Sequence, residues 1–315
     1  MIDIVVLYCD DNDPKWKESF NYYKNLEITT GQANIKNRQA FGDERYRDWE
    51  VFKYWFRGVE INCSWFNKIF LVVANEDQVP KWLNTTNPKL RIVYHDEFIP
   101  KELLPTFNAT TIELYLSYIK DLSDVYVFCN DDFYFINKTP STYFFRDNKL
   151  VYGTNEMIFH YFNRELEKGT DGTFYKGLNN CRLLQKTLAN DNKAYGFSHL
   201  PMPHSTPFEK QILTFNSQIF INAQISSRFR HKTNYASYVF DCLYRALNDY
   251  IQDDIYKNSK YVTLKSTVNF NEYANCDMVC FNDTEQLDDF EKTKRRLITF
   301  FENKFPNKSS FEKDI

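Results

Sequence analysis

The stretch CNDDFYF (residues 129–135) places two neighbouring carboxylates, Asp131 and Asp132, between an apolar run and a group of aromatic residues. Hard oxygen ligands suit Mg2+ or Mn2+, and a divalent cation held by such a pair can neutralise a bound diphosphate. The chain contains a second polar pair that follows an apolar run, Asn282-Asp283. Because Asn and Asp also favour turns, a surface turn without chemistry is the alternative interpretation of both pairs.

Two of the five histidines, His199 and His204, lie in one proline-rich segment, FSHLPMPHSTPFEK (residues 197–210). Proline restricts the backbone, so this segment can hold an imidazole as a general base within hydrogen-bond reach of an acceptor hydroxyl. Metal ligation by the two histidines and a rigid surface loop are the alternatives. The chain contains no GxSxG motif, so Ser/His/Asp hydrolase chemistry is not supported.

Two groups of arginines are candidate anion sites. Arg228 and Arg230 precede His231 in SSRFRHK, and Arg45 and Arg47 lie near the predicted start of a helix. A guanidinium group donates forked hydrogen bonds to phosphate oxygens, and a helix N-terminus also favours anions. Salt bridges to structural carboxylates are the alternative for both groups.

The first half of the chain alternates between β-branched apolar stretches and segments with helical periodicity. The predicted strands are residues 2–8, 68–75, 90–94 and 125–129, and the predicted helices are residues 15–24, 48–61 and a segment within 105–119. This alternation predicts an α/β fold with a mainly parallel sheet covered by helices. Since ligands bind beyond the carboxyl ends of parallel strands, the polar groups at residues 10–13 and 130–132 are expected at one edge.

The second half is expected to be a helical part integrated with the sheet. Residues 148–192 are polar and irregular, and KGTDGTFYKG (residues 168–177) is expected to form a flexible lid. The last ten residues are expected to be loosely ordered. Helices are predicted at residues 208–226, 236–252 and within 282–305.

The composition argues against several functional classes. A formal charge of −3, with acids and bases interspersed, does not favour nucleic acid as a partner. The chain has 8 glycines and neither a GxGxxG nor a GxxxxGK[ST] motif, so a bound nucleotide would be held by side chains and metal. No apolar run reaches about 18 residues, and the first residues lack a basic region, so neither a membrane helix nor a signal peptide is expected.

The seven cysteines are scattered and odd in number, which predicts buried free thiols in a reducing compartment. Only Cys276 and Cys280 are close in sequence. Because no second Cys/His pair lies near them in the sequence, a structural zinc site is not expected.

Four segments of this chain resemble, in order, the four conserved regions of the Stealth family. The family includes bacterial capsular and cell-wall polysaccharide phosphotransferases and the catalytic subunit of the animal GlcNAc-1-phosphotransferase. Tyr8 and Asp11 depart from the family pattern, which usually has Trp and Gly there. The segments are IDIVVLYCDDNDPKW (residues 2–16), ERYRDW running on to YVFCNDDFYF (44–135), SHLPMPHSTPFEK with SSRFRHK (198–232), and VCFNDTEQLDDFEKTKRRLITFFENKFP (279–306).

The resemblance implies a Rossmann-like, nucleotide-sugar-transferase-like core that uses Mg2+ or Mn2+. The implied reaction transfers a sugar 1-phosphate from a UDP-sugar to a hydroxyl of an acceptor glycan, releases UMP and leaves a phosphodiester. Residues 1–147 would bind the nucleotide sugar, and residues 148–315 would carry the lid and the acceptor and catalytic helices of the same domain. A cytoplasmic location is expected, at the inner face of the membrane if the acceptor is lipid-linked.

The resemblance also assigns roles to single residues. His199 would be the catalytic base, with His204 as the alternative register, and Arg228 is a near alternative to Arg230. The remaining catalytic positions fall on Arg230, Asp132 and Glu113, the nucleotide-sugar-binding positions on Asp10, Asp13, Arg45, Arg47 and Asp48, and the metal-binding positions on Asp131, Asp132, Asn282 and Asp283.

Two other functions remain open on the sequence alone. A conventional metal-dependent glycosyltransferase would use the same acidic edge but would release UDP. A non-catalytic carbohydrate-binding protein would use its aromatic residues, 18% of the chain, to stack on sugars and would show no nucleotide turnover.

Overall fold

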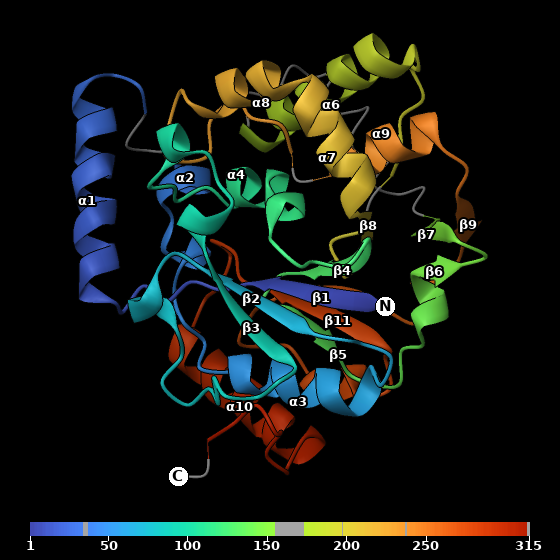
Figure 1. Cartoon of the computed structure of the whole chain (residues 1–315). Helices are drawn as coiled ribbons and strands as arrows, with labels where there is room; N and C mark the ends of the chain where they lie inside the picture. Colours follow the sequence, from blue (N-terminus) through green and yellow to red (C-terminus); the bar gives the residue numbers. More distant parts are fainter. Residues whose placement is uncertain (34–36, 155–172, 197, 237, 314–315) are drawn as a thin grey trace.

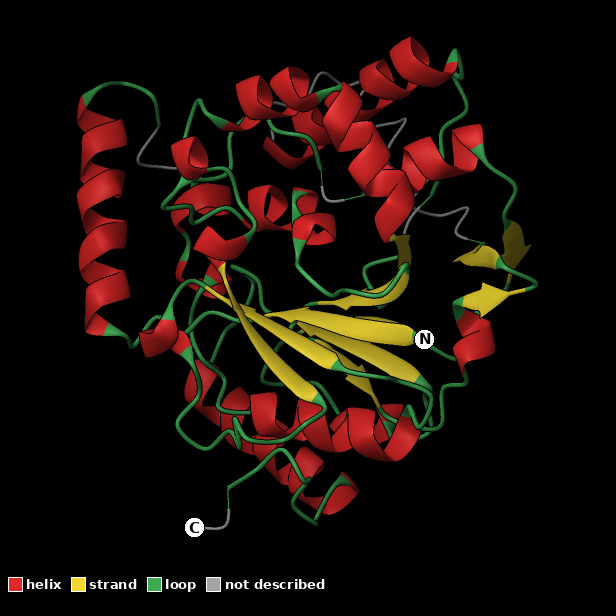
Figure 2. Cartoon of the chain, in the orientation of Figure 1, coloured by secondary structure: helices red, strands yellow, loops and turns green. Residues whose placement is uncertain are grey.

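A five-stranded sheet lies at the centre of the computed structural model, which describes residues 1–33, 37–154, 173–196, 198–236 and 238–313 (Figures 1 and 2). Its strand order is β3-β2-β1-β4-β8. The first four strands are parallel, and β8 runs antiparallel to β4. The predicted mainly parallel α/β fold is therefore confirmed. The strands are β1 (Ile2–Leu7), β2 (Ile69–Val73), β3 (Leu90–Tyr94), β4 (Val125–Cys129) and β8 (Met202–Ser205).

Helices cover both faces of the sheet (Figure 1). Successive β1 residues, such as Ile4 and Val5, are buried in different apolar clusters, as expected for a sheet that is covered on both sides. On one face the sheet packs against α3 (Phe52–Asn62) and α10 (Phe290–Lys304). On the other face lie α4 (Ala109–Leu114), α6 (Thr173–Ala189), α7 (Thr206–Phe215), α8 (Ser217–Gln224) and α9 (Val239–Leu247).

Two smaller sheets complete the described structure. One has the order β10-β11-β5, from β10 (Lys260–Thr263), β11 (Met278–Asn282) and β5 (Phe133–Phe135). The antiparallel pairing of β11 with β5 sets Cys280 opposite Phe133, next to the carboxyl end of β4. The other sheet joins β6 (Phe145–Arg146), β7 (Lys149–Gly153) and β9 (Ile251–Asp253).

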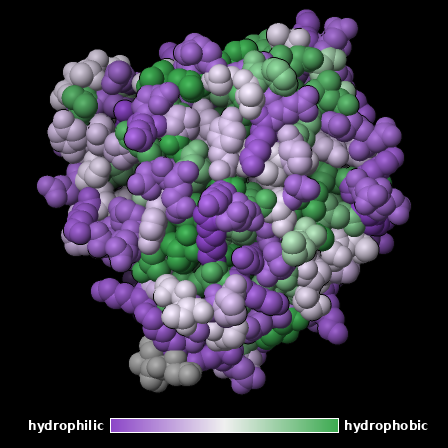
Figure 3. All heavy atoms as spheres, viewed as in Figure 1, coloured by the Kyte–Doolittle hydropathy of each residue, from purple (hydrophilic) through white to green (hydrophobic). Residues whose placement is uncertain are grey.

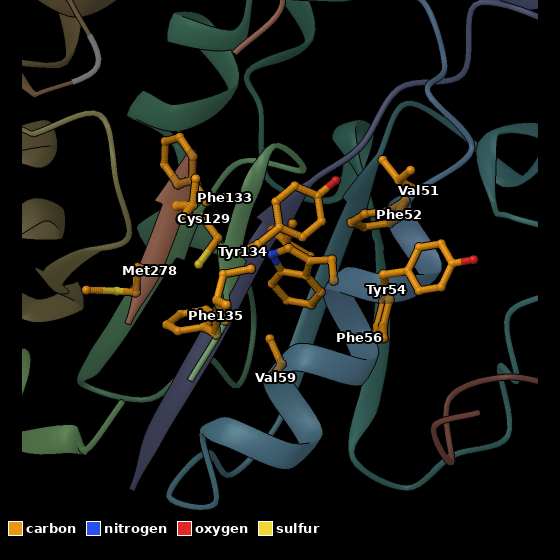
Figure 4. Packing of buried hydrophobic residues seen from close by; sticks show 14 of the residues in the cluster. Val51, Phe52, Tyr54, Phe56, Val59, Cys129, Phe133, Tyr134, Phe135 and Met278 are labelled. Carbon is orange, nitrogen blue, oxygen red and sulfur yellow. The ribbon is translucent and has the colours of Figure 1, made fainter. Parts of the chain in front are cut away.

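The core between α3 and the sheets is rich in aromatic side chains (Figure 4). Trp55, Phe56 and Phe135 are fully buried there. Gly58 is required at its position, because a Cβ atom would lie 2.8 Å from the backbone oxygen of Phe135. This close approach fixes α3 against β5, and β5 begins directly after the Asp131-Asp132 turn.

A third apolar cluster anchors α1 (Pro14–Thr29) and α2 (Arg38–Phe41) at the side of the sheet (Figure 1). Trp16 and Phe20 of α1 pack against Phe107 and Phe229, which lie far apart in the sequence. Asp13 caps the helix, since its side chain accepts a hydrogen bond from the backbone N–H of Lys15.

Several predictions for the second half were wrong. Residues 148–192 are not irregular throughout, because they contain β7 and the 17-residue helix α6. Of the predicted lid, residues 168–172 lie outside the described residues, and residues 173–177 form the start of α6 rather than a flexible loop. Residues 236–252 form the shorter helix α9 and then enter β9.

The last residues are packed rather than loose. Phe311 is buried, and Glu312 accepts hydrogen bonds at 2.6 and 2.7 Å from the guanidinium group of Arg57 in α3. Residues from both predicted parts of the chain, 1–147 and 148–315, share one apolar cluster. The functional division of the chain at residue 147 stays a prediction.

The view in Figure 3 shows mostly hydrophilic side chains with smaller apolar areas between them. Within the described part of the chain, every helix is too short or too polar to span a lipid bilayer. All seven cysteines are free and six of them are buried, as the sequence predicted.

Candidate active site

A cavity of about 1140 Å³ opens at the carboxyl edge of the central sheet. Its wall includes Cys9 after β1, Ala74 after β2 and the turn that follows β4. The short helix α4 contributes Glu113, and the end of β11 contributes Asn282. Most of the residues that the sequence analysis selected therefore meet in one place, at the edge where open parallel sheets bind ligands. These residues are Arg45, Arg47, Asp48, Glu113, Asp131, Asp132, His199, Arg230, Asn282 and Asp283.

The acidic side of this cavity is formed by Asp131, Asp132 and Asp48. Burial, together with the carboxylates of Asp132 and Asp48, raises the pKa of Asp131 to about 8. Burial also raises the pKa of Asp132 to about 6, although a hydrogen bond from Cys280 favours its charged form. Carboxyl groups held together in this way repel each other when ionised, so a cation placed between them would be bound strongly.

Asp132 has an oxygen atom available for such a cation. Its Oδ1 atom is buried and has no hydrogen-bond partner among the described residues, while its Oδ2 atom lies 3.4 Å from the Sγ atom of Cys280. A buried, unsatisfied carboxylate oxygen is costly unless a ligand fills the site. Asp131 and Asp132 therefore fit the oxygen-rich environment that Mg2+ or Mn2+ requires.

The basic side is formed by Arg45 and Arg230. Neither guanidinium group forms a salt bridge within the described part of the chain. Burial, together with the positive charge of Arg45, lowers the pKa of Arg230 to about 10, and Glu113 partly offsets this effect. Two guanidinium groups that line one cavity and repel each other form a strong site for an anion such as a diphosphate.

His199 lies beside these two arginines. Its ring packs edge-on against Phe133, with centroids 4.8 Å apart, and against Tyr261 at 5.8 Å. Burial and the positive charges of Arg230 and Arg45 lower the pKa of His199 to about 4. The imidazole is therefore neutral at pH 7 and can accept a proton, as a general base must.

His204, the alternative base, occupies a different environment. It lies in β8, stacks on Tyr126 and donates a 2.7 Å hydrogen bond from Nδ1 to the Glu209 carboxylate. Burial opposes the charged imidazole, but the Glu209 carboxylate outweighs burial and raises the pKa of His204. His204 does not line the cavity among the described residues, so the geometry favours His199 as the base.

Arg47 and Asp283 pair with each other across the cavity wall. The Arg47 Nε and Nη2 atoms donate to the two Asp283 carboxylate oxygens at 2.5 and 2.6 Å. Trp49 Nε1 donates a third hydrogen bond to Asp283 at 3.1 Å, and Phe290 lies under the guanidinium group at 4.7 Å. For Arg47 this is the salt bridge to a carboxylate that the sequence analysis left open as the alternative, whereas Asp283 was not predicted as its partner.

Asp10, Asp13 and Arg228 line no part of the cavity among the described residues. Asp13 caps α1 and also accepts a 2.9 Å hydrogen bond from Gln78. The Asp10 side chain accepts hydrogen bonds from the backbone and side-chain nitrogens of Asn12. The predicted role of Asp10 and Asp13 in nucleotide-sugar binding stays a prediction.

Sequence reasoning missed Cys280 and Tyr261, which lie beside Asp132 and His199. Cys280 is inside an apolar strand, and a thiol there usually serves only as a small core residue. The one signal in the sequence was its position two residues before the Asn282-Asp283 pair. Its contact with Asp132 depends on the pairing of β11 with β5, which only the folded structure provides.

Comparison with known proteins identifies relatives of this chain. The family model for Stealth protein CR2, conserved region 2, matches residues 45–152, which include Arg45, Glu113, Asp131 and Asp132. The chain is 31% identical over 344 residues to a capsular polysaccharide phosphotransferase, WcwK, of Streptococcus pneumoniae, and the alignment covers 99% of both chains. The chain belongs to the Stealth family.

Other Stealth relatives extend the comparison. A receptor polysaccharide phosphotransferase, WefC, of Streptococcus oralis is 29% identical over 340 residues, which cover 99% of each chain. A capsular polysaccharide phosphotransferase, CpsJ, of Streptococcus thermophilus is 43% identical over 150 residues, which cover 47% of this chain and 59% of CpsJ. This Stealth protein is accordingly a transferase enzyme.

Proposed function

We propose that this protein transfers a hexose 1-phosphate or an N-acetylhexosamine 1-phosphate from a UDP-sugar to a hydroxyl of an acceptor glycan. The products would be a phosphodiester and UMP, and the process would be the synthesis of a capsular or cell-surface polysaccharide. The observation that carries the proposal is a single cavity with an acidic side, Asp131 and Asp132, and a basic side, Arg45 and Arg230.

The two sides suit the two requirements of a diphosphate substrate. Mg2+ or Mn2+, when bound by Asp131 and Asp132, would neutralise the negative charge of the diphosphate. Arg45 and Arg230 would donate hydrogen bonds to the oxygens of the phosphoryl group that is transferred, where charge must be stabilised in the transition state. Glu113 acts electrostatically on Arg230 and would keep its guanidinium group charged.

His199 would act on the acceptor. Its neutral imidazole removes the proton from the acceptor hydroxyl, and the hydroxyl oxygen forms a bond to the phosphorus that carries the sugar. The bond from this phosphorus to the bridging oxygen breaks, and its electron pair leaves with UMP. The bond between the sugar carbon and its oxygen stays intact, so the anomeric configuration is retained.

The nucleotide product tests this proposal. The protein is incubated with a panel of UDP-sugars, Mg2+ and candidate acceptors, both free and lipid-linked, and nucleotides are separated by chromatography. UMP that depends on the acceptor is the expected product. UDP as the main product would instead indicate a conventional glycosyltransferase, and no nucleotide turnover with any pair would indicate a binding protein. Turnover with lipid-linked acceptors alone would support a position at the inner face of the membrane.

Asp132→Asn is the matched variant for the metal role, because it keeps the shape of the side chain and removes its charge. Asp77→Asn is its control, since Asp77 lies outside the cavity wall in an exposed salt bridge with Lys15. We expect Asp132→Asn to lower UMP release by about 100-fold or more and Asp77→Asn to leave it unchanged. Equal activity of the two variants would contradict the assignment of Asp132.

A further inference from the structure

Three side chains of different chemistry converge at the acidic end of the cavity. One ligand atom from each of Asp132, His199 and Cys280 lies within 4.8 Å of the other two. Cys280 Sγ lies 3.4 Å from Asp132 Oδ2. Among the described residues, this is the one group of three or more such side chains with this spacing.

The three residues come from separate parts of the fold. Cys280 lies in β11, Asp132 follows β4, and His199 precedes β8. A backbone hydrogen bond of 3.0 Å from Phe281 to the Asp132 oxygen ties β11 to the turn that carries Asp132. The His199 ring packs edge-on against Phe133 and Tyr261. Hence the site is formed by the folded core rather than by an exposed loop.

A thiol, an imidazole and a carboxylate are a typical ligand set for Zn2+, whereas Mg2+ and Mn2+ prefer oxygen atoms alone. With Zn–S distances of about 2.3 Å and Zn–N or Zn–O distances of about 2.0 Å, tetrahedral ligand atoms lie about 3.3 to 3.6 Å apart. The 3.4 Å separation of Cys280 and Asp132 already falls in this range. His199 needs at most a shift of about 1.5 Å, which side-chain rotation provides.

The position of the group decides what fills the remaining coordination site. Cys280 is buried, whereas Asp132 and His199 both line the cavity. A fourth ligand, water or a phosphate oxygen, would therefore reach the ion from the cavity. Three protein ligands with one open position are the pattern of an accessible zinc site.

We propose that Asp132, His199 and Cys280 bind one Zn2+ ion, with the fourth position open to the cavity. Binding releases the Cys280 thiol proton to solvent and forms the thiolate–zinc bond. This consequence rests on the proposed function, in which Asp132 binds Mg2+ and His199 is the base. Zn2+ would occupy both residues, so it is an inhibitor that competes with Mg2+. The site thus discriminates between a hard cation that supports turnover and a thiophilic cation that blocks it.

Co2+ alone, added to the metal-free protein, tests the site without substrate, because cobalt replaces zinc and reports its ligands in the absorption spectrum. We expect one equivalent to give a thiolate-to-cobalt charge-transfer band and tetrahedral visible bands, and Zn2+ to abolish both. Cys280→Ser should lose the charge-transfer band. Cys276→Ser is the matched control, since Cys276 is a buried free cysteine four residues away, and it should keep the band.

A second variant guards against misfolding of Cys280→Ser. His199→Ala changes a side chain in the cavity wall and should weaken Co2+ binding by about 100-fold or more while circular dichroism stays unchanged. Absence of a charge-transfer band in the unmodified protein would overturn the proposal, as would a band that survives Cys280→Ser.

Activity measurements separate this proposal from the proposed function. Zinc inhibition of UMP release that excess Mg2+ relieves would support both. A cobalt spectrum of the expected kind in a protein that releases no UMP would retain the zinc site and overturn the proposed function. Normal UMP release that Zn2+ leaves unchanged, with no cobalt band, would retain the proposed function and overturn the zinc site.

Discussion

Substitution of Asp283 by Asn tests whether the Arg47–Asp283 pair is structural, as its geometry indicates. The Asp283 carboxylate accepts two hydrogen bonds from Arg47 and one from Trp49, and its side chain is only 8% exposed. The change keeps the volume of the side chain but removes its charge, so Arg47 is left without its partner in a partly buried position.

The expected loss of stability follows from this burial. Breaking a buried ion pair by removing one partner costs about 3 to 5 kcal/mol, and the 25% exposure of Arg47 places the value near the lower end, at about 3 kcal/mol. An unfolding entropy of about 2.1 cal/mol/K per residue gives roughly 0.66 kcal/mol/K for this chain. The melting temperature should therefore fall by about 4 to 5 °C.

Urea unfolding of four proteins measures the pair directly: the unmodified chain, Asp283→Asn, Arg47→Met and the double variant. We expect the double variant to be less destabilised than the sum of the single variants, with a coupling energy of about 2 kcal/mol. Asp77→Asn is the control, because it breaks an exposed pair with Lys15 and should change stability by less than about 1 kcal/mol.

Two results would refute this reasoning. Additive single effects would mean that Arg47 and Asp283 do not interact in solution. Unchanged stability of Asp283→Asn together with weaker binding of Mg2+ would return Asp283 to the metal-ligand role that the resemblance implied.

Three further predictions concern the cavity. His199→Gln should lower kcat by about 100-fold or more without loss of stability. His204→Gln should chiefly lower the melting temperature, because it weakens the buried contact with Glu209. The opposite pattern would make His204 the base. In steady-state kinetics, Arg230→Met should reduce kcat more than it raises KM for the UDP-sugar. An effect on KM alone would mean that Arg230 contributes only to binding of the substrate in its ground state. Burial raises the pKa of Asp131 to about 8, so between about pH 4 and pH 8 the metal-free folded protein holds a proton that the unfolded chain has released, and stability falls as pH rises. In urea unfolding with a chelator present, Asp131→Asn should flatten this decrease. An unchanged slope would contradict the raised pKa of Asp131.

Local patterns in the sequence were sufficient for the four parallel strands of the central sheet. The β-branched runs predicted β1, β2, β3 and β4 to within about two residues. Helix α6 was missed, although Leu178, Cys181 and Leu184 are buried with the spacing of one helical face. The glycines and polar residues before this segment obscured that period. The packed C-terminus had no local signal, because Glu312 finds its partner, Arg57, 255 residues earlier in the chain.

The site shows the same division between local and long-range information. Strand ends were enough to select Asp131 and Asp132, since parallel strands present their carboxyl ends at one edge. Charge patterns offered the arginines in two groups, and the family resemblance was needed to choose Arg230 over Arg228. The pairing of Arg47 with Asp283 joins residues 236 positions apart, and their predicted roles as ligands stay predictions. No spacing rule in a single sequence contains that contact.

The nature of the released nucleotide tests the central claim most directly. With a UDP-sugar, Mg2+ and a hydroxyl acceptor, the unmodified protein should release UMP in equal amount to the phosphodiester formed, and Asp132→Asn should release about 100-fold less or lower still. Release of UDP with formation of a plain glycosidic bond would contradict the claim that the two carboxylates serve cleavage between the phosphates.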